Sequence, residues 1–150
     1  MSNYPAWWDK TLTIYNKRID ATTRKITWHR TVVTNCFWKY VNEIYANQYT
    51  TVRVAYPTKS VIVRIPEDER FLKTGEYAHA DDVTGKFTLA EGDIIILGEV
   101  DDVLDEYTAG QRKSDIITKY KDTGECIEIK SHTDDVGTAL ALPHYHVQGV

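Results

Sequence analysis

The chain has 150 residues, of which 42% are hydrophobic and 27% are charged, and its formal net charge is −4. This length and composition predict one soluble globular domain with a hydrophobic core. The mild acidic bias argues against a non-specific nucleic-acid binder, which normally presents a basic face. The N-terminus lacks the basic and apolar regions of a signal peptide, and no apolar run reaches the ~18 residues of a membrane span. We therefore expect no membrane partner and a location in the cytoplasm where the protein is made.

The first ten residues, 1–10, predict an aromatic arm. It contains Tyr4, Trp7 and Trp8 next to a proline. A Trp–Trp pair is costly to leave in water, so the arm should dock on its own domain or on a neighbouring molecule. The rest of the chain, 11–150, predicts a single β domain.

The first part of the β domain is rich in β-branched and aromatic residues, which are enriched in strands. Alternating side chains predict strands at 11–18 and 25–33, joined by a turn at 20–23. Residues 35–41 predict a third strand, or a continuation of the second strand after a bend near Asn35.

The next stretch combines two strands with segments of weaker pattern. Residues 42–48 predict either a wide loop or one helical turn. Strands are expected at 49–56 and 60–65, with a turn at 57–59 between them. Residues 67–86 are polar and predict an irregular loop.

The second half of the chain contains the strongest strand and the only convincing helix. Residues 87–89 predict a short edge piece. After the tight turn Glu91-Gly92-Asp93, the β-branched run at 94–100 predicts a buried strand. Apolar residues then recur at helical spacing, which predicts a short helix over 109–121.

The C-terminal segment predicts an alternating strand at 125–132, a loop at 133–137 and a final strand at 144–149. The chain thus contains about seven or eight expected strands, and they do not alternate with helices. A parallel sheet built from βαβ units is therefore not expected. The predicted fold is mainly β: a small antiparallel β-barrel or sandwich with one short inserted helix and long loops.

The final strand carries the best candidate metal ligands, His144 and His146. Residues two apart on a strand face the same side, so the two imidazoles could share one ion. A metal site also needs a third ligand, for which His132, Asp134 and Asp135 are the nearest candidates. The simpler interpretation is a pair of surface or interface histidines, so we predict no metal and no cofactor.

The chain shows no catalytic motif. Its acidic groups all lie in expected loops, where solvated charge explains them: Glu67-Asp68-Glu69, Asp81-Asp82, Asp101-Asp102 and Asp134-Asp135. No glycine-rich phosphate loop is present. The two cysteines, Cys36 and Cys126, have no metal spacing and are expected to be buried thiols. We therefore predict that the protein is not an enzyme.

The order of several segments resembles a family of small uncharacterised proteins of tailed bacteriophages and prophages. The segments that carry this resemblance are Thr13–Asn16, Trp28–Val33 with Phe37-Trp38, Val63–Pro66, Phe87–Glu99, Tyr120–Asp122 and Leu142–Gly149. They extend over most of the chain from about residue 11 onward. Each motif is common by itself, and the weight lies in their order.

The resemblance implies a virion structural protein of the phage neck, namely a head-closure (stopper) or connector component. It implies a homo-oligomeric ring, hexameric or dodecameric, between portal or adaptor and tail proteins. Viral DNA would pass through the lumen without sequence-specific binding, and the protein would reside in the host cytoplasm until assembly. The resemblance transfers no catalytic residue.

A ring subunit needs exposed anchors, and aromatic residues are enriched at interfaces. The chain has ten Tyr and four Trp against three Phe. The candidate interface residues lie in the arm and in two long loops: Tyr4, Trp7, Trp8, Tyr77, Asp101, Asp102 and Tyr107. Three alternatives remain open: a tail terminator or tail-tube component, a carbohydrate- or ligand-binding β domain with Trp28 and Trp38 as its platform, and a metal-dependent enzyme that uses the histidine pair.

Overall fold

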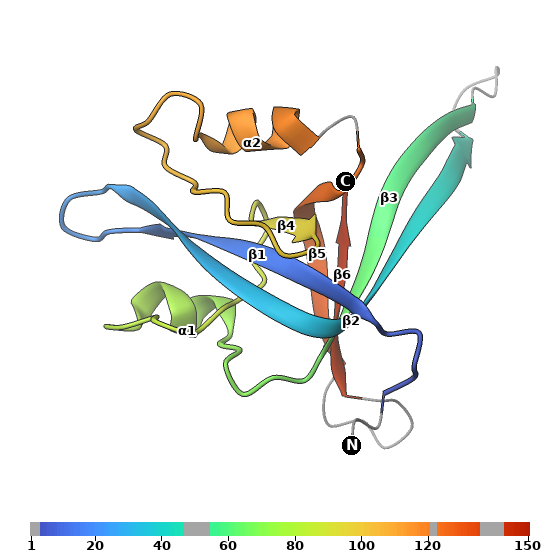
Figure 1. The fold of residues 1–150 in the computed structure, drawn as a ribbon, viewed down its shortest axis with the longest axis horizontal. Coiled ribbons are helices and arrows are strands. Elements are labelled where there is room, and N and C mark those ends of the chain that lie inside the picture. Colours follow the sequence, from blue (N-terminus) through green and yellow to red (C-terminus); the bar gives the residue numbers. More distant parts are fainter. Residues whose placement is uncertain (1–3, 47–54, 121–122, 136–142) are drawn as a thin grey trace.

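The computed structural model describes residues 4–46, 55–120, 123–135 and 143–150. Its strands are β1 (Lys10–Ile19), β2 (Ile26–Ala46), β3 (Ala55–Pro66), β4 (Ile94–Leu97), β5 (Cys126–Asp135) and β6 (His144–Gly149). Its helices are α1 (Thr74–His79) and α2 (Lys113–Tyr120). The strands form a closed antiparallel barrel in the order β1-β2-β3-β6-β5-β4 (Figure 1). The expected small antiparallel β-barrel is therefore confirmed, with one more short helix than expected.

The long strand β2 belongs to both halves of the barrel. Its first part pairs with β1, and its second part pairs with β3 from Phe37 onward. Between these parts the β1 register shifts, because Leu12 faces Val33 whereas Lys10 faces Cys36. Asn35 has a positive φ of 58° at this bulge, a conformation that asparagine tolerates better than most residues. Of the two expectations for residues 35–41, continuation after a bend near Asn35 is therefore confirmed.

Two hydrophobic clusters hold the barrel. The main cluster fills the interior with alternate side chains of all six strands, including Leu12, Val63, Ile95 and Val147. The second cluster lies under α2 and the loop before it: Tyr15, Ile94, Ile96, Leu104 and Ile116. Strand β4 thus has both faces covered, which explains its uninterrupted Ile-Ile-Ile run.

Two pairs of strands extend beyond the closed barrel. Residues 42–46 of β2 pair with residues 55–59 of β3, whereas β6 reaches β3 only at Val61–Pro66. We call the paired residues 42–46 and 55–59 the β2–β3 ribbon. At the other end, the tip of the β1–β2 hairpin extends beyond the short strand β4. Figure 1 shows the ribbon and the hairpin tip pointing in different directions.

The ribbon corrects two expectations. Residues 42–46 form part of β2 and not a loop or helical turn, and residues 57–59 lie inside β3 and not in a turn. The composition of these two segments suggested that the strands end there. Instead, pairing between β2 and β3, such as that of Ile44 with Pro57, extends both strands through them. Residues 47–54, which include the end of the expected loop or helical turn and most of the strand expected at 49–56, lie outside the described part of the chain.

Several other elements begin or end at residues that differ from those expected from the sequence. The expected irregular loop 67–86 contains α1, and residue Phe87 makes a single parallel bridge with Phe71. The strand expected at 94–100 ends at Leu97, because Gly98 has a φ of 94°. The helix expected over 109–121 is shorter in the structure, where α2 covers Lys113–Tyr120. Strand β5 continues to Asp135 and so includes the first residues of the loop expected at 133–137. Strand β6 has the expected bounds.

Candidate functional site

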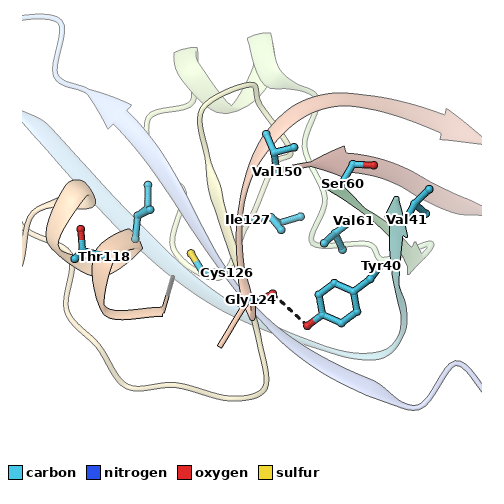
Figure 2. Close-up of a pocket in the computed structure, with 10 residues that line it drawn as sticks. Tyr40, Val41, Ser60, Val61, Thr118, Gly124, Cys126, Ile127 and Val150 are labelled. Carbon is cyan, nitrogen blue, oxygen red and sulfur yellow. Dashed lines mark hydrogen bonds between the residues drawn. The ribbon is translucent and has the colours of Figure 1, made fainter. Parts of the chain in front are cut away.

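A cavity of about 610 Å³ opens at the end of the barrel where the β2–β3 ribbon leaves it. We call it the mouth cavity (Figure 2). It is lined by Tyr40, Val41, Ser60, Val61, Ile117, Thr118, Gly124, Cys126, Ile127 and Val150. These residues come from strands β2, β3 and β5, helix α2, the turn before β5 and the last residue of the sequence. No stretch of sequence contains more than a few of them, so only folding brings them together.

The floor of the mouth cavity is apolar and its rim is exposed. Val61 and Ile127 are 5% and 2% exposed, whereas Tyr40 and Val150 on the rim are 56% and 53% exposed. The Tyr40 hydroxyl donates a hydrogen bond of 3.1 Å to the carbonyl oxygen of Gly124 (Figure 2). This bond fixes the Tyr40 side chain at the rim, where more than half of it is exposed to solvent.

Two side chains of the mouth cavity, Cys126 and Ser60, carry groups that could act as nucleophiles. Burial, followed by the nearby Glu128 carboxylate, raises the pKa of the Cys126 thiol to about 12. The thiol is therefore protonated at neutral pH and is a poor nucleophile. The Ser60 hydroxyl accepts a hydrogen bond of 3.4 Å from the Gln148 side chain. No Asp, Glu, His, Lys or Arg side chain is among the ten lining residues.

The N-terminal arm docks on its own domain through Trp8. This side chain is only 7% exposed and lies beside Tyr4, Phe37 and His144, with ring centroids 5.3, 6.3 and 5.6 Å away. The Tyr4 hydroxyl donates a hydrogen bond to the carbonyl oxygen of Pro143. Trp7 remains 68% exposed. Of the three aromatic residues in the arm, Trp7 is the most exposed and remains an interface candidate.

Tyr77 lies in the interior and not on the surface. It is 2% exposed and anchors α1 to the barrel. Its expected place at an interface is therefore wrong for the folded domain. The sequence placed it in an irregular polar loop, but tertiary packing makes it the buried residue of a short helix.

The two residues of the acidic pair after β4 differ in exposure, because Asp102 is partly buried and Asp101 is exposed. Asp102 accepts a hydrogen bond of 2.6 Å from the Lys119 ammonium and another from the Tyr120 hydroxyl. Burial raises the pKa of Asp102, but these two bonds outweigh it and the net shift is downward. Asp101 is fully exposed and pairs with Arg30 at 3.3 Å. Asp102 therefore links its own loop to α2, and its place at an interface stays a prediction.

Tyr107 remains an interface candidate. It is 61% exposed, and its hydroxyl accepts a hydrogen bond of 3.0 Å from the backbone N–H of Ile26. Ile26 pairs with Ile19, which is 54% exposed. Tyr107 and Ile19 thus form an exposed apolar surface at the tip of the β1–β2 hairpin.

His144 and His146 lie on one face of β6, as the spacing predicted. His144 packs edge-on against Trp8 with ring centroids 5.6 Å apart. His132 lies 3.7 Å from Asp134. Within the described ranges, no three His, Cys, Asp or Glu side chains are grouped so that they could hold a metal ion. The third ligand that a metal site requires is therefore not found in this part of the chain.

Trp28 and Trp38 do not form one platform. Trp28 packs against the cluster under α2 and donates a hydrogen bond of 3.1 Å to Glu106. Trp38 packs against the main barrel cluster and lies edge-on to Tyr40. Because the two rings belong to different hydrophobic clusters, the expected aromatic stacking surface is wrong.

A family model described as "Family of unknown function (DUF6751)" matches residues 7–150. No curated protein matches the chain, and no solved structure matches it. None of the helices described in the structure is long and apolar enough to cross a membrane.

Proposed function

The chain belongs to the DUF6751 family of unknown function, and we propose that it is a structural subunit that assembles with copies of itself into a ring. The role that we assign to the ring is that of a head-closure or connector component of a phage neck. The observation that carries the proposal is the β2–β3 ribbon, which extends beyond the closed barrel.

The ribbon has backbone groups that need partners. Among the described residues, 42–46 and 55–59 pair only with each other. In a two-stranded antiparallel ribbon, every second N–H and C=O on each strand points outward. Such a ribbon is marginally stable alone, and its edges can pair with another chain. A neighbouring copy would satisfy these groups and stabilise the ribbon.

The mouth cavity offers apolar contact area at the base of the ribbon. Tyr40 and Val150 are exposed on its rim above the apolar floor. The exposed surface formed by Ile19 and Tyr107 lies on a different part of the molecule, at the hairpin tip. When two different surfaces of neighbouring copies meet, the contact is heterologous. Such contacts generate a ring if the rotation from one copy to the next closes after a whole turn.

The phage role rests on the resemblance in motif order along the chain. The formal net charge of −4 supports it, because an acidic lumen would let DNA pass with little phosphate binding. We therefore propose a hexameric or dodecameric ring with portal or adaptor and tail proteins as partners, in the virion and before that in the host cytoplasm. A tail terminator or tail-tube component would use the same contacts, and neither role requires an enzyme.

The test is the mass and shape of the purified full-length chain. We expect light scattering to give a discrete oligomer and negative-stain micrographs to show rings. Tyr40→Glu should shift the population toward monomer, because it places a charge on the apolar rim. Lys39→Glu is the matched control, since Lys39 is the next residue on β2 and faces the opposite side. A protein that stays monomeric at every concentration would contradict the proposal.

A second candidate function is a ligand-binding β domain. The mouth cavity is within the ~300–1,000 Å³ typical of ligand pockets, and barrel mouths commonly hold them. Its apolar floor favours a small apolar ligand over a sugar. A monomer that binds an apolar dye with a saturable signal, lost in Val61→Phe, would favour this function over the ring.

A further inference from the structure

A second cavity, of about 280 Å³, lies between β1, α1 and the turn before β4. We call it the α1 cavity. Three buried residues with polar side chains are among those that line it: Tyr77 from α1, Thr88, and Asp93 from the turn. All three side chains are 2% exposed. The α1 cavity shares no lining residue with the mouth cavity, so it is a separate site.

Two hydroxyl groups in the α1 cavity lack partners. Among the described residues, neither the Tyr77 hydroxyl nor the Thr88 Oγ1 has a hydrogen-bond partner. Buried polar groups are nearly always hydrogen-bonded, so each unpaired one requires an explanation, and a bound polar group is one of them. Burial, then the Asp93 charge, raises the pKa of Tyr77 to about 12, so its hydroxyl stays protonated and its oxygen can accept.

Asp93 provides a buried acceptor with one position open. Its carboxylate accepts hydrogen bonds from the Asn16 side chain and from the backbone N–H groups of Lys17 and Ala90. A carboxylate has about four acceptor positions, so one of them is left. In the described part of the chain, no cation lies within ion-pair distance of Asp93. The nearby Lys113 is paired with Glu128 at 3.3 Å.

We propose that the α1 cavity binds a primary ammonium group through the oxygens of Tyr77, Thr88 and Asp93. An ammonium group has three N–H donors, which match the three acceptors, and its charge complements the buried carboxylate. An anion would be repelled by Asp93, and an apolar group would leave both hydroxyls unpaired. Arg18 lines the cavity, but its guanidinium donates to the carbonyl oxygen of Ala80.

The ammonium group has two possible sources, a free small amine or a lysine of a neighbouring copy. Lys17 also lines the cavity, but its own ammonium is not within ion-pair distance of Asp93. The recognition chemistry is the same for both sources. The inference does not depend on the proposed ring, because it rests on the buried oxygens of Tyr77, Thr88 and Asp93, which the ring contacts do not use.

The test is an NMR titration of the full-length ¹⁵N-labelled chain with propylammonium chloride at constant ionic strength. We expect saturable shifts of the amide signals of Lys17, Thr88 and Ala90. Tetramethylammonium, which has the same charge and no N–H donor, should leave them unshifted. Equal responses to the two ions would overturn the proposal.

Variants locate the binding. Tyr77→Phe keeps the ring that anchors α1 and removes only the hydroxyl, so it should weaken propylammonium binding by about tenfold. Tyr145→Phe is the matched control, because this tyrosine is also buried and lies outside the α1 cavity, and binding should be unchanged. Unaltered affinity in Tyr77→Phe would overturn the proposal.

The mass of the protein in solution distinguishes the two sources of the ammonium group, a free amine and a lysine of a neighbouring copy. If a neighbouring copy supplies the lysine, propylammonium should lower the mass of the oligomer measured by light scattering. If the ligand is a free amine, the mass should not change while the NMR signals shift. Either result supports an ammonium site. A protein that is monomeric throughout can still bind the amine. Failure of the proposed ring can therefore be distinguished from failure of the ammonium site.

Discussion

The side-chain amide of Asn16 donates a hydrogen bond of 2.8 Å to the carboxylate of Asp93, and both residues are almost completely buried. Asn16 also donates to the carbonyl oxygen of Thr88 at 2.6 Å and accepts from its N–H at 3.2 Å. Burial raises the pKa of Asp93, and the bond from Asn16 opposes this shift. One amide thus connects β1 to the segment that leads into β4.

Asn16→Leu should destabilise the protein by about 2–4 kcal/mol. The change removes a donor from a buried carboxylate and leaves the backbone groups of Thr88 unpaired. Urea denaturation followed by circular dichroism measures the loss. In an Asp93→Asn background the same change should cost less, because the two residues share one network. Strictly additive losses would show that the network is not coupled.

Gly149→Ala should destabilise the protein by about 1–3 kcal/mol. A Cβ at this position would lie 2.5 Å from the carbonyl oxygen of Glu128, where β5 and β6 approach each other. Thermal unfolding measures the change. Gly75→Ala in α1 is the matched control, since a Cβ there meets nothing within 4 Å. The control should leave stability unchanged or raise it by about 0.5–1 kcal/mol, and equal losses in both variants would contradict the steric argument.

Asp102 should make the stability of the loop and α2 dependent on pH. Its pKa is lowered in the folded protein by the bonds from Lys119 and Tyr120, which outweigh the effect of burial. A carboxylate with a lowered pKa contributes stability above its unfolded value, and this contribution is lost as the pH falls through the folded value. Stability should therefore decrease below about pH 5 in the native chain and less steeply in Asp102→Asn. Parallel curves in urea melts at several pH values would contradict this role.

The two thiols should react slowly with maleimides in the folded protein. Burial, then the charge of Asp68, raises the pKa of Cys36 to about 12, and Cys126 is raised to a similar value. At pH 8 both should be labelled more than about tenfold more slowly than a free thiol. Cys126 lines the mouth cavity, whereas Cys36 is fully buried, so Cys126 should react first. Mass spectrometry of Cys126→Ser, which retains only Cys36, checks the order.

Local patterns in the sequence predict the strands that face the core. Alternation of side chains places β1, the first part of β2 and β6 close to their observed bounds, because inward-facing residues must be apolar. The class of fold follows from the same pattern. Strands that are frequent and not separated by helices pair in antiparallel fashion.

Residues 42–46 and 57–59 show where local reasoning fails. Their composition favours a break in the strand, but pairing between β2 and β3 extends both strands beyond the barrel. Helix α1 and the burial of Tyr77 likewise depend on contacts with the barrel that its polar surroundings in sequence do not reveal.

By itself, the sequence determined the β class, the main strand segments and the two histidines that share a face of β6. Only the tertiary structure decided the closure of the barrel, the β2–β3 ribbon and the two cavities. The physical reason is that side-chain alternation is a property of neighbouring residues, whereas a cavity depends on distant ones. Tyr40 and Val150, or Tyr77 and Asp93, line the same cavities only after the strands have paired.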